Sequence, residues 1–264
     1  MNDNEAKDVL LFEAKDGIGW ITFNRPEARN AMTFAMYDRL TEICNFAQED
    51  RGIKALVLTG AGEKAFVSGT DISQFRAFKT AEDAFAYEAR IDRVLGALES
   101  VRVPTIAAIS GACTGGGAAI AACCDLRIAA ANTRFGFPVA RTLGNCLSMN
   151  NYARLNNLIG AARIKELIFT ARLMEAEEAA EIGLVSEVVP DKEALLARAG
   201  ALAAHVAGMA PLTLEATKQA LLRLQTRLSK GEGEDLVRLC YTSNDFREGM
   251  EAFLEKRKPN WTGR

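Results

Sequence analysis

Hydrophobic and polar positions over residues 1–200 follow two alternating patterns, one typical of strands and one typical of helices. Residues 9–13 and 18–23 are β-rich runs separated by a glycine-containing loop, which predicts a hairpin. Apolar residues then recur at helical spacing, which predicts a helix over residues 33–48 with Thr33 as its N-cap. Further strands are predicted at residues 54–59, 105–110 and 126–130, and a further helix at about 81–98. Recurring strand–turn–helix units indicate an α/β core.

From about residue 161 the pattern changes to one helix after another. Helices are predicted at residues 161–170, 175–182, 191–206, 211–228 and 245–258, with one short strand at 184–189. We therefore divide the chain into an α/β core over residues 1–200 and a helical domain over residues 201–264.

Two glycine-bearing turns stand out within the predicted core. One holds three consecutive glycines, residues 115–117, between a strand and an Ala-rich apolar run that predicts a buried helix. The other, residues 65–72, follows the strand at 54–59 and places Asp71 near a helix start. Glycine is also typical of tight turns and close packing, but such junctions leave backbone N–H groups unpaired. Each turn could direct one amide at a single carbonyl oxygen, where negative charge develops.

These turns, with residues 24–32 and 248–259, resemble four motifs of the crotonase superfamily, the enoyl-CoA hydratase/isomerase family, in the same order and over nearly the whole chain. The resemblance implies an α/β fold, a crotonase-like spiral of ββα units with a C-terminal helical oligomerisation domain. It also implies an acyl-CoA substrate and a homotrimer, often paired into a hexamer. Coenzyme A would enter as part of the thioester substrate, with no tightly bound cofactor and no metal.

The same resemblance assigns site residues. The backbone N–H groups of Thr70 and Gly116 would form an oxyanion hole around the thioester carbonyl. Residues expected to contact coenzyme A are Arg29, Ser68, Thr70, Asp71, Ile72, Gly116, Phe253 and Lys256. Arg29 would suit the 3′-phosphate, whereas Phe253 and Lys256 would lie beside the coenzyme A of a neighbouring subunit. Without the resemblance, Arg29 and Lys256 indicate only a solvated charged face.

Relatives that hydrate a double bond use two glutamates, and neither is present here. The matching positions fall on Ala119 and on Val139, or on Ala140 in a shifted alignment, and none of these side chains can transfer a proton. Replacement groups could come from the polar segment 141–152, whose candidates are Arg141, Asn145, Cys146 and Ser148. Ser148 or Asn150 could instead cap the following helix. Asp71, Tyr87 and Glu88 are further candidates.

Composition narrows the classes of protein to which this chain could belong. The 264 residues are 49% hydrophobic and 25% charged with a net charge of −2, which is typical of a globular protein and gives no basic field for nucleic acid or membrane. Six cysteines without metal-ligand spacing, and a polar start without a signal peptide, predict a cytoplasmic protein. The single histidine, His205, lies far from the turns, and nucleophile-elbow and Walker motifs are absent from the sequence.

Three interpretations stay open. The favoured one is an acyl-CoA enzyme that stabilises an enolate and moves the proton without the glutamate pair, as in isomerisation, decarboxylation or thioester cleavage. The second is a hydratase or lyase with a displaced carboxylate such as Asp71 or Glu88. The third is a catalytically silent oligomer that binds coenzyme A.

Overall fold

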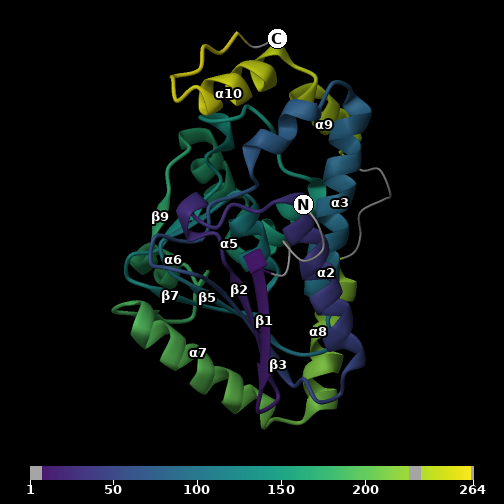
Figure 1. The fold of residues 1–264 in the computed structure, drawn as a ribbon, viewed down its shortest axis with the longest axis vertical. Coiled ribbons are helices and arrows are strands. Elements are labelled where there is room, and N and C mark those ends of the chain that lie inside the picture. The colour runs from purple at the N-terminus through teal and green to yellow at the C-terminus, as the bar shows by residue number, and fades with distance from the viewer. Residues whose placement is uncertain (1–7, 226–232, 263–264) are drawn as a thin grey trace.

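The larger of two sheets carries the predicted hairpin and the predicted parallel strands. A computed structural model describes residues 8–225 and 233–262 (Figure 1). The sheet has the order β1-β2-β3-β5-β7-β10, in which β1 pairs antiparallel with β2 and every other pairing is parallel. Its strands are β1 Leu10–Lys15, β2 Ile18–Phe23, β3 Ala55–Gly60, β5 Thr105–Ile109, β7 Leu126–Ala130 and β10 Val188–Val189. The predicted strands at 54–59, 105–110 and 126–130 are thereby confirmed.

A second, smaller sheet accounts for the expected spiral of ββα units. Its strands are β4 Ala65–Val67, β6 Ala112–Thr114, β8 Arg134–Gly136 and β9 Met174–Glu175, with the first three parallel in the order β4-β6-β8. Each long parallel strand is thus followed by a short strand of the other sheet and then by a helical segment, three times in succession. The predicted α/β fold of repeated ββα units is confirmed.

Helices cover both faces of the larger sheet. One apolar core gathers α2 Phe34–Glu49, α3 Ala81–Ser100 and α4 Gly116–Cys123, and a second packs α7 Lys192–Ala207 on the opposite face. Helix α2 begins as predicted, because the Thr33 side chain accepts a hydrogen bond from the Met36 N–H. Residue 200, the end of the predicted core domain, lies inside α7, and Ala203 beyond it is buried against the sheet.

The later helices depart from prediction at their ends. Helix α5 spans Met149–Thr170 with a break at Gly160, where φ is +76°, and α6 spans Ala176–Glu181. Helix α8 covers Pro211–Gln225, and residues 226–228 of its predicted range lie outside the described residues. Helix α9, Glu234–Tyr241, was not predicted. Helix α10, Asn244–Leu254, ends short of the predicted residue 258, and Lys256 beyond it has a φ of +56°.

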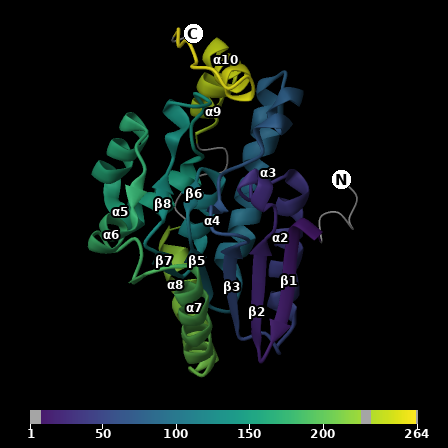
Figure 2. The same cartoon turned by 60° about the vertical axis from the view of Figure 1, so that its left-hand side comes forward.

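Different helices lie at the two ends of the molecule. Helices α7 and α8 lie at one end and α9 and α10 at the other, in both views (Figures 1 and 2). A third cluster packs α9 and α10 onto α3 and the 3₁₀ helix η2, Ile72–Ala77, which follows the second glycine-bearing turn.

Within the described chain no single helix is long and apolar enough to cross a membrane; α7 and α8 satisfy length and composition only when combined across a 102° bend.

Candidate active site

The two glycine-bearing turns meet in space. Strands β4 and β6 are parallel neighbours, so the turns that follow them leave from the same edge of the small sheet. A Cβ atom added to Gly116 would lie 3.6 Å from the Thr70 amide nitrogen and 3.3 Å from Thr70 Oγ1. Two segments more than forty residues apart thus bring their backbones into contact at one point.

Glycine is required at this junction for packing. The added Cβ of Gly116 would lie only 2.3 Å from the Tyr37 hydroxyl, and that of Gly117 only 2.1 Å from the Val67 carbonyl oxygen. Gly115 has a φ of +53°, a conformation that L side chains rarely adopt. Close packing therefore selects these glycines, and the same close approach places the two turns side by side.

Both backbone amides at the junction are free to bind a ligand. Met32 donates its N–H to Gly69 O and accepts from the Asp71 N–H, and this bridge leaves the Thr70 N–H without an acceptor among the described residues. Gly116 is the first residue of α4, where the amide has no intrahelical acceptor and the helix dipole is positive. Two such donors suit an anionic carbonyl oxygen.

Two tyrosines fix the Thr70 side chain. The Tyr37 and Tyr87 hydroxyls each lie 2.9 Å from Thr70 Oγ1. Burial raises the pKa of Tyr37 to about 12, although its hydrogen bond to Thr70 works against the shift, and burial raises the pKa of Tyr87 well above its ordinary value. Both hydroxyls therefore stay protonated. Sequence analysis missed Tyr37, which sits in a helix with no motif around it.

Asp71 is the N-cap of η2. Its carboxylate accepts from the Ser73 N–H at 3.2 Å and hydroxyl at 2.7 Å, and both terminal nitrogens of the Arg25 guanidinium lie 3.2 Å from Oδ2. Burial would raise the pKa of Asp71, but these hydrogen bonds outweigh it and lower that pKa. Asp71 is thus a paired carboxylate that holds the turn carrying Thr70.

The polar segment after η3, Pro138–Ala140, divides into several environments. Arg141 is exposed at the end of η3. The Cys146 thiol donates a hydrogen bond to the Leu236 carbonyl oxygen at 3.5 Å, and its interaction with Cys240 and its burial raise the pKa of Cys146. Ser148 caps α5 through the Asn151 N–H, as one of the two predictions had it.

Asn145 joins the segment to the C-terminal helices. Its Nδ2 donates to the Tyr241 hydroxyl at 3.2 Å, whereas its Oδ1 is buried without a hydrogen-bond partner among the described residues. The Tyr241 hydroxyl in turn donates to Glu88 Oε1 at 2.5 Å. Burial raises the pKa of Glu88 to about 7; the bond from Tyr241 works against this shift and the charge of Asp92 adds to it. Tyr241 was missed because it lies on the unpredicted α9.

The positions where the hydratase glutamates were expected hold apolar side chains. Ala119 is buried inside α4 and Val139 is buried in η3, while Ala140 is exposed. His205 is exposed in the last turn of α7. In residues 8–225 and 233–262 no group of three or more His, Cys, Asp or Glu side chains could hold a metal ion.

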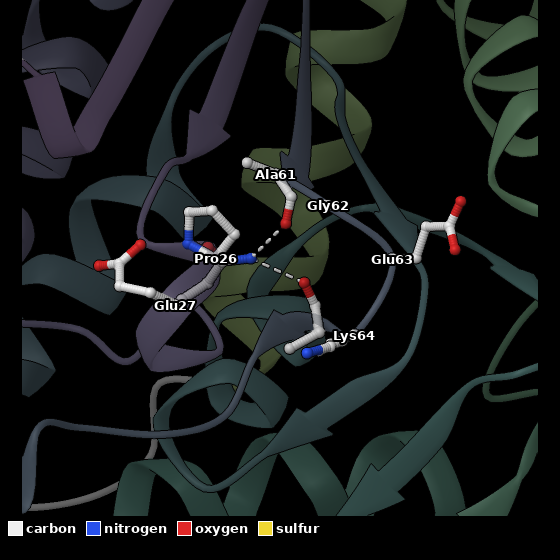
Figure 3. A pocket seen from close by; sticks show the side chains of 8 residues that line it. Pro26, Glu27, Ala61, Gly62, Glu63 and Lys64 are labelled. Carbon is white, nitrogen blue, oxygen red and sulfur yellow. Dashed lines mark hydrogen bonds between the residues drawn. The ribbon is translucent and has the colours of Figure 1, made fainter.

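The expected coenzyme A contacts fall in two places. The Arg29 carbonyl accepts from the Ser68 N–H at 3.1 Å, which ties the N-terminal motif to the turn before Thr70 and Ile72. Beside Arg29, a hollow of about 290 Å³ lies between residues 26–30 and the β3–β4 loop, where Asn30 Nδ2 donates to Ala61 O and Ala65 O (Figure 3). Phe253 and Lys256 are exposed at the end of α10.

Known proteins resemble the chain over its whole length. The family model described as enoyl-CoA hydratase/isomerase matches residues 13–264. The chain is 37% identical over 262 residues to a short-chain-enoyl-CoA hydratase of Clostridium acetobutylicum, covering 96% of this chain and 97% of that one. It is 34% identical over 259 residues to a crotonyl-CoA hydratase of Syntrophomonas wolfei, covering 97% and 98%.

Solved structures agree with this. A methylmalonyl-CoA decarboxylase in complex with 2-nitronate-propionyl-CoA superposes with a TM-score of 0.88 at 28% identity, covering 97% of this chain and 99% of that chain. An enoyl-CoA hydratase/carnithine racemase from Magnetospirillum magneticum superposes with a TM-score of 0.79 at 35% identity, covering 97% and 96%. The chain therefore belongs to the enoyl-CoA hydratase/isomerase family, within the crotonase superfamily.

Proposed function

We propose that this acyl-CoA enzyme binds the thioester carbonyl between the Thr70 and Gly116 amides and stabilises an enolate there. The observation that carries the proposal is the contact between the two turns, with a Thr70 nitrogen 3.6 Å from a Cβ position on Gly116. A preorganised donor of this kind typically contributes roughly 3–4 kcal/mol to lowering a barrier. Thr70 can fill this position without penalty because only its backbone N–H is used.

The reaction proposed is isomerase-, decarboxylase- or hydrolase-type, without the usual pair of glutamates. General acid–base catalysis needs a titratable group within hydrogen-bond reach of the reacting atom, and Ala119 and Val139 supply none. The structural similarity to a methylmalonyl-CoA decarboxylase supports chemistry of this kind on the same backbone.

A second candidate is hydration by a displaced carboxylate. It is favoured by the names of the relatives at 34–37% identity, which are hydratases. Asp71 is the weaker choice for that carboxylate because Arg25 and Ser73 already occupy it, whereas Glu88 has a pKa near neutrality.

The proposed assembly is a homotrimer or hexamer of cytoplasmic subunits, with coenzyme A bound only as part of the substrate. Large apolar side chains exposed on the C-terminal helices support subunit packing: Leu212 is 77% exposed, Leu221 56% and Phe253 50%. In such an assembly Phe253 and Lys256 would contact the coenzyme A of a neighbouring subunit. Arg29, Ser68, Asp71 and Ile72 would contact it within the subunit.

The test is a panel of thioesters offered to the purified protein. We expect turnover of a 3-enoyl-CoA, a malonyl-type thioester or a saturated ester at least tenfold faster than hydration of crotonyl-CoA. Absorbance of the conjugated thioester reports isomerisation and hydration, and release of free thiol reports hydrolysis. Fast crotonyl-CoA hydration would favour the second candidate, and binding without any turnover would indicate a silent oligomer.

A further inference from the structure

One carboxyl group near the two turns has no structural partner of opposite charge. Glu88 lies on α3, half-buried, and accepts from the Tyr241 hydroxyl of α9 at 2.5 Å. Among the described residues no Lys, Arg or His lies within ion-pair distance of it, whereas Asp71 is paired with Arg25 and Glu99 with Arg154. A half-buried carboxyl without a cation is costly for stability, which makes a use in chemistry the better explanation.

Contacts link Glu88 to the glycine-bearing turn that carries Thr70. The preceding residue, Tyr87, is hydrogen-bonded to Thr70 Oγ1, and its ring lies 6.4 Å from the Tyr241 ring between centroids. The charge of Glu88 also acts on the buried Tyr37 hydroxyl, which is bonded to the same Thr70 oxygen. Tyr87 and Tyr241 therefore connect the Glu88 carboxyl to the turn that carries Thr70.

An unused acceptor sits in the same group. Asn145 Nδ2 holds the Tyr241 hydroxyl at 3.2 Å, and Asn145 Oδ1 is buried without a partner among the described residues. A buried amide oxygen normally has a donor, so this atom is suited to a donor from a bound molecule. Asn145, Tyr241 and Glu88 form a chain of hydrogen bonds from three separate elements.

We propose, on the basis of the proposed function, that Glu88 is the proton-transfer group in the isomerisation of a 3-enoyl thioester. The ionised carboxylate takes a proton from C2, and the C–H electron pair moves toward the thioester oxygen held by the Thr70 and Gly116 amides. The enolate then collapses, and the protonated Glu88 returns the same proton to C4. The double bond moves from C3–C4 to C2–C3 with no net gain or loss of protons.

Tyr241 and Asn145 act as positioning residues in this scheme. One carboxyl that both removes and returns a proton is sufficient for isomerisation, whereas the usual hydration mechanism employs two. The titratable groups that interact electrostatically with Glu88 are Tyr87 and Asp92 on its own helix, and Tyr37, Tyr152, Tyr241 and Cys146 from other elements.

The test combines isomerisation with an exchange reaction that needs only the base. The full-length protein is incubated with 3-hexenoyl-CoA, and separately with butyryl-CoA in deuterium oxide, where mass spectrometry follows exchange at C2. We expect Glu88→Gln to lower both rates about 100-fold or more, with butyryl-CoA affinity within about twofold of the unmodified protein. Glu88→Asp should retain part of the activity. Glu82→Gln, an exposed carboxyl on the same helix, serves as the matched control.

The outcomes separate this inference from the proposed function. If the unmodified enzyme exchanges C2 protons and Glu88→Gln does so equally well, Glu88 is not the base and the oxyanion proposal stands. If the unmodified enzyme neither exchanges nor turns over any thioester, both proposals fail. A positioning role for Tyr241 predicts that Tyr241→Phe moves the pH midpoint of kcat/KM upward, because a hydrogen bond that lowers the pKa of Glu88 is lost. An unchanged midpoint would contradict that role.

Discussion

The proposed site has two parts that are built by different means: the two glycine-bearing turns, and the Glu88 group of Glu88, Tyr241 and Asn145. The first half consists of backbone amides at Thr70 and Gly116, placed by two strand ends that are neighbours in one sheet. The second half consists of side chains from α3, α9 and the segment after η3, joined only by tertiary packing. A backbone site leaves glycines in the sequence, whereas a side-chain site of this kind leaves no motif.

The largest effect is expected at Gly116. Gly116→Ala places a Cβ 2.3 Å from the Tyr37 hydroxyl, so Tyr37 and the Thr70 oxygen bonded to it must move. We expect kcat to fall about 100- to 1,000-fold, as for loss of an oxyanion donor. Steady-state kinetics with the best thioester measures this effect.

Two variants control that experiment. Gly96→Ala lies in α3 with nothing near its added Cβ and should leave kcat unchanged. Tyr37→Phe in the Gly116→Ala background removes the clashing oxygen and should restore part of the rate. Full activity of Gly116→Ala would show that the turn does not bind the carbonyl.

A gain of function tests the missing carboxylates. Ala119→Glu combined with Val139→Glu places glutamates at the two positions where the resemblance to hydrating relatives predicts them. If the Thr70 and Gly116 amides bind the thioester carbonyl as proposed, crotonyl-CoA hydration should rise about tenfold or more. The loss of absorbance at the conjugated thioester reports the rate. A folded double variant that binds the thioester without any gain would count against the placement of these two positions.

Glu88 should give an unusual dependence of stability on pH. Its pKa in the folded protein, about 7, exceeds the ordinary value of 4.5, so the folded state holds the proton more tightly than the unfolded state. The group therefore costs no stability below about pH 4.5, and its cost grows as pH rises through 7. Glu88→Gln should make the protein more stable at pH 8 by about 1–3 kcal/mol and leave it nearly unchanged at low pH. Urea unfolding at several pH values measures this difference, and equal stability at pH 8 would contradict it.

Asp71 should behave in the opposite sense. Its folded pKa is lowered, so the stability it contributes is present above its ordinary pKa and is lost as pH falls through the folded pKa. Asp71→Asn should destabilise by about 1 kcal/mol at pH 7, as for a weakened cap and a partly exposed ion pair. It should also lower kcat by less than Glu88→Gln does, since it acts through the Thr70 turn. A larger kcat loss for Asp71→Asn would exchange the roles of the two carboxyls.

Sequence reasoning succeeded where local rules decide the structure. Thr33 caps α2 because its hydroxyl meets a free N–H one turn on, and β7 spans the predicted residues 126–130. It failed where tertiary contacts decide. The strands β4, β6 and β8 are three residues long and are fixed only by their neighbours, and α9 is only eight residues long.

The candidate site shows the same difference between features set by local rules and features set by tertiary contacts. The glycines that bring Thr70 and Gly116 together could be identified from the sequence because close backbone contact excludes a Cβ. The roles of Tyr37 and Tyr241 could not be identified, because their hydrogen-bond partners are 33 and 153 residues away in the sequence. Nor could the burial of Asn145 Oδ1 without a partner among the described residues. Glu88 was named as a candidate, but only the structure gives it a hydroxyl partner and, among the described residues, no cation.

A crystal structure with butyryl-CoA bound is the most direct test of the paired amides. We expect the thioester oxygen to lie about 2.7–3.1 Å from both the Thr70 and the Gly116 nitrogen, with the acyl C2 facing the Glu88 carboxyl. A thioester oxygen that contacts neither nitrogen, in a fully occupied complex, would contradict the account.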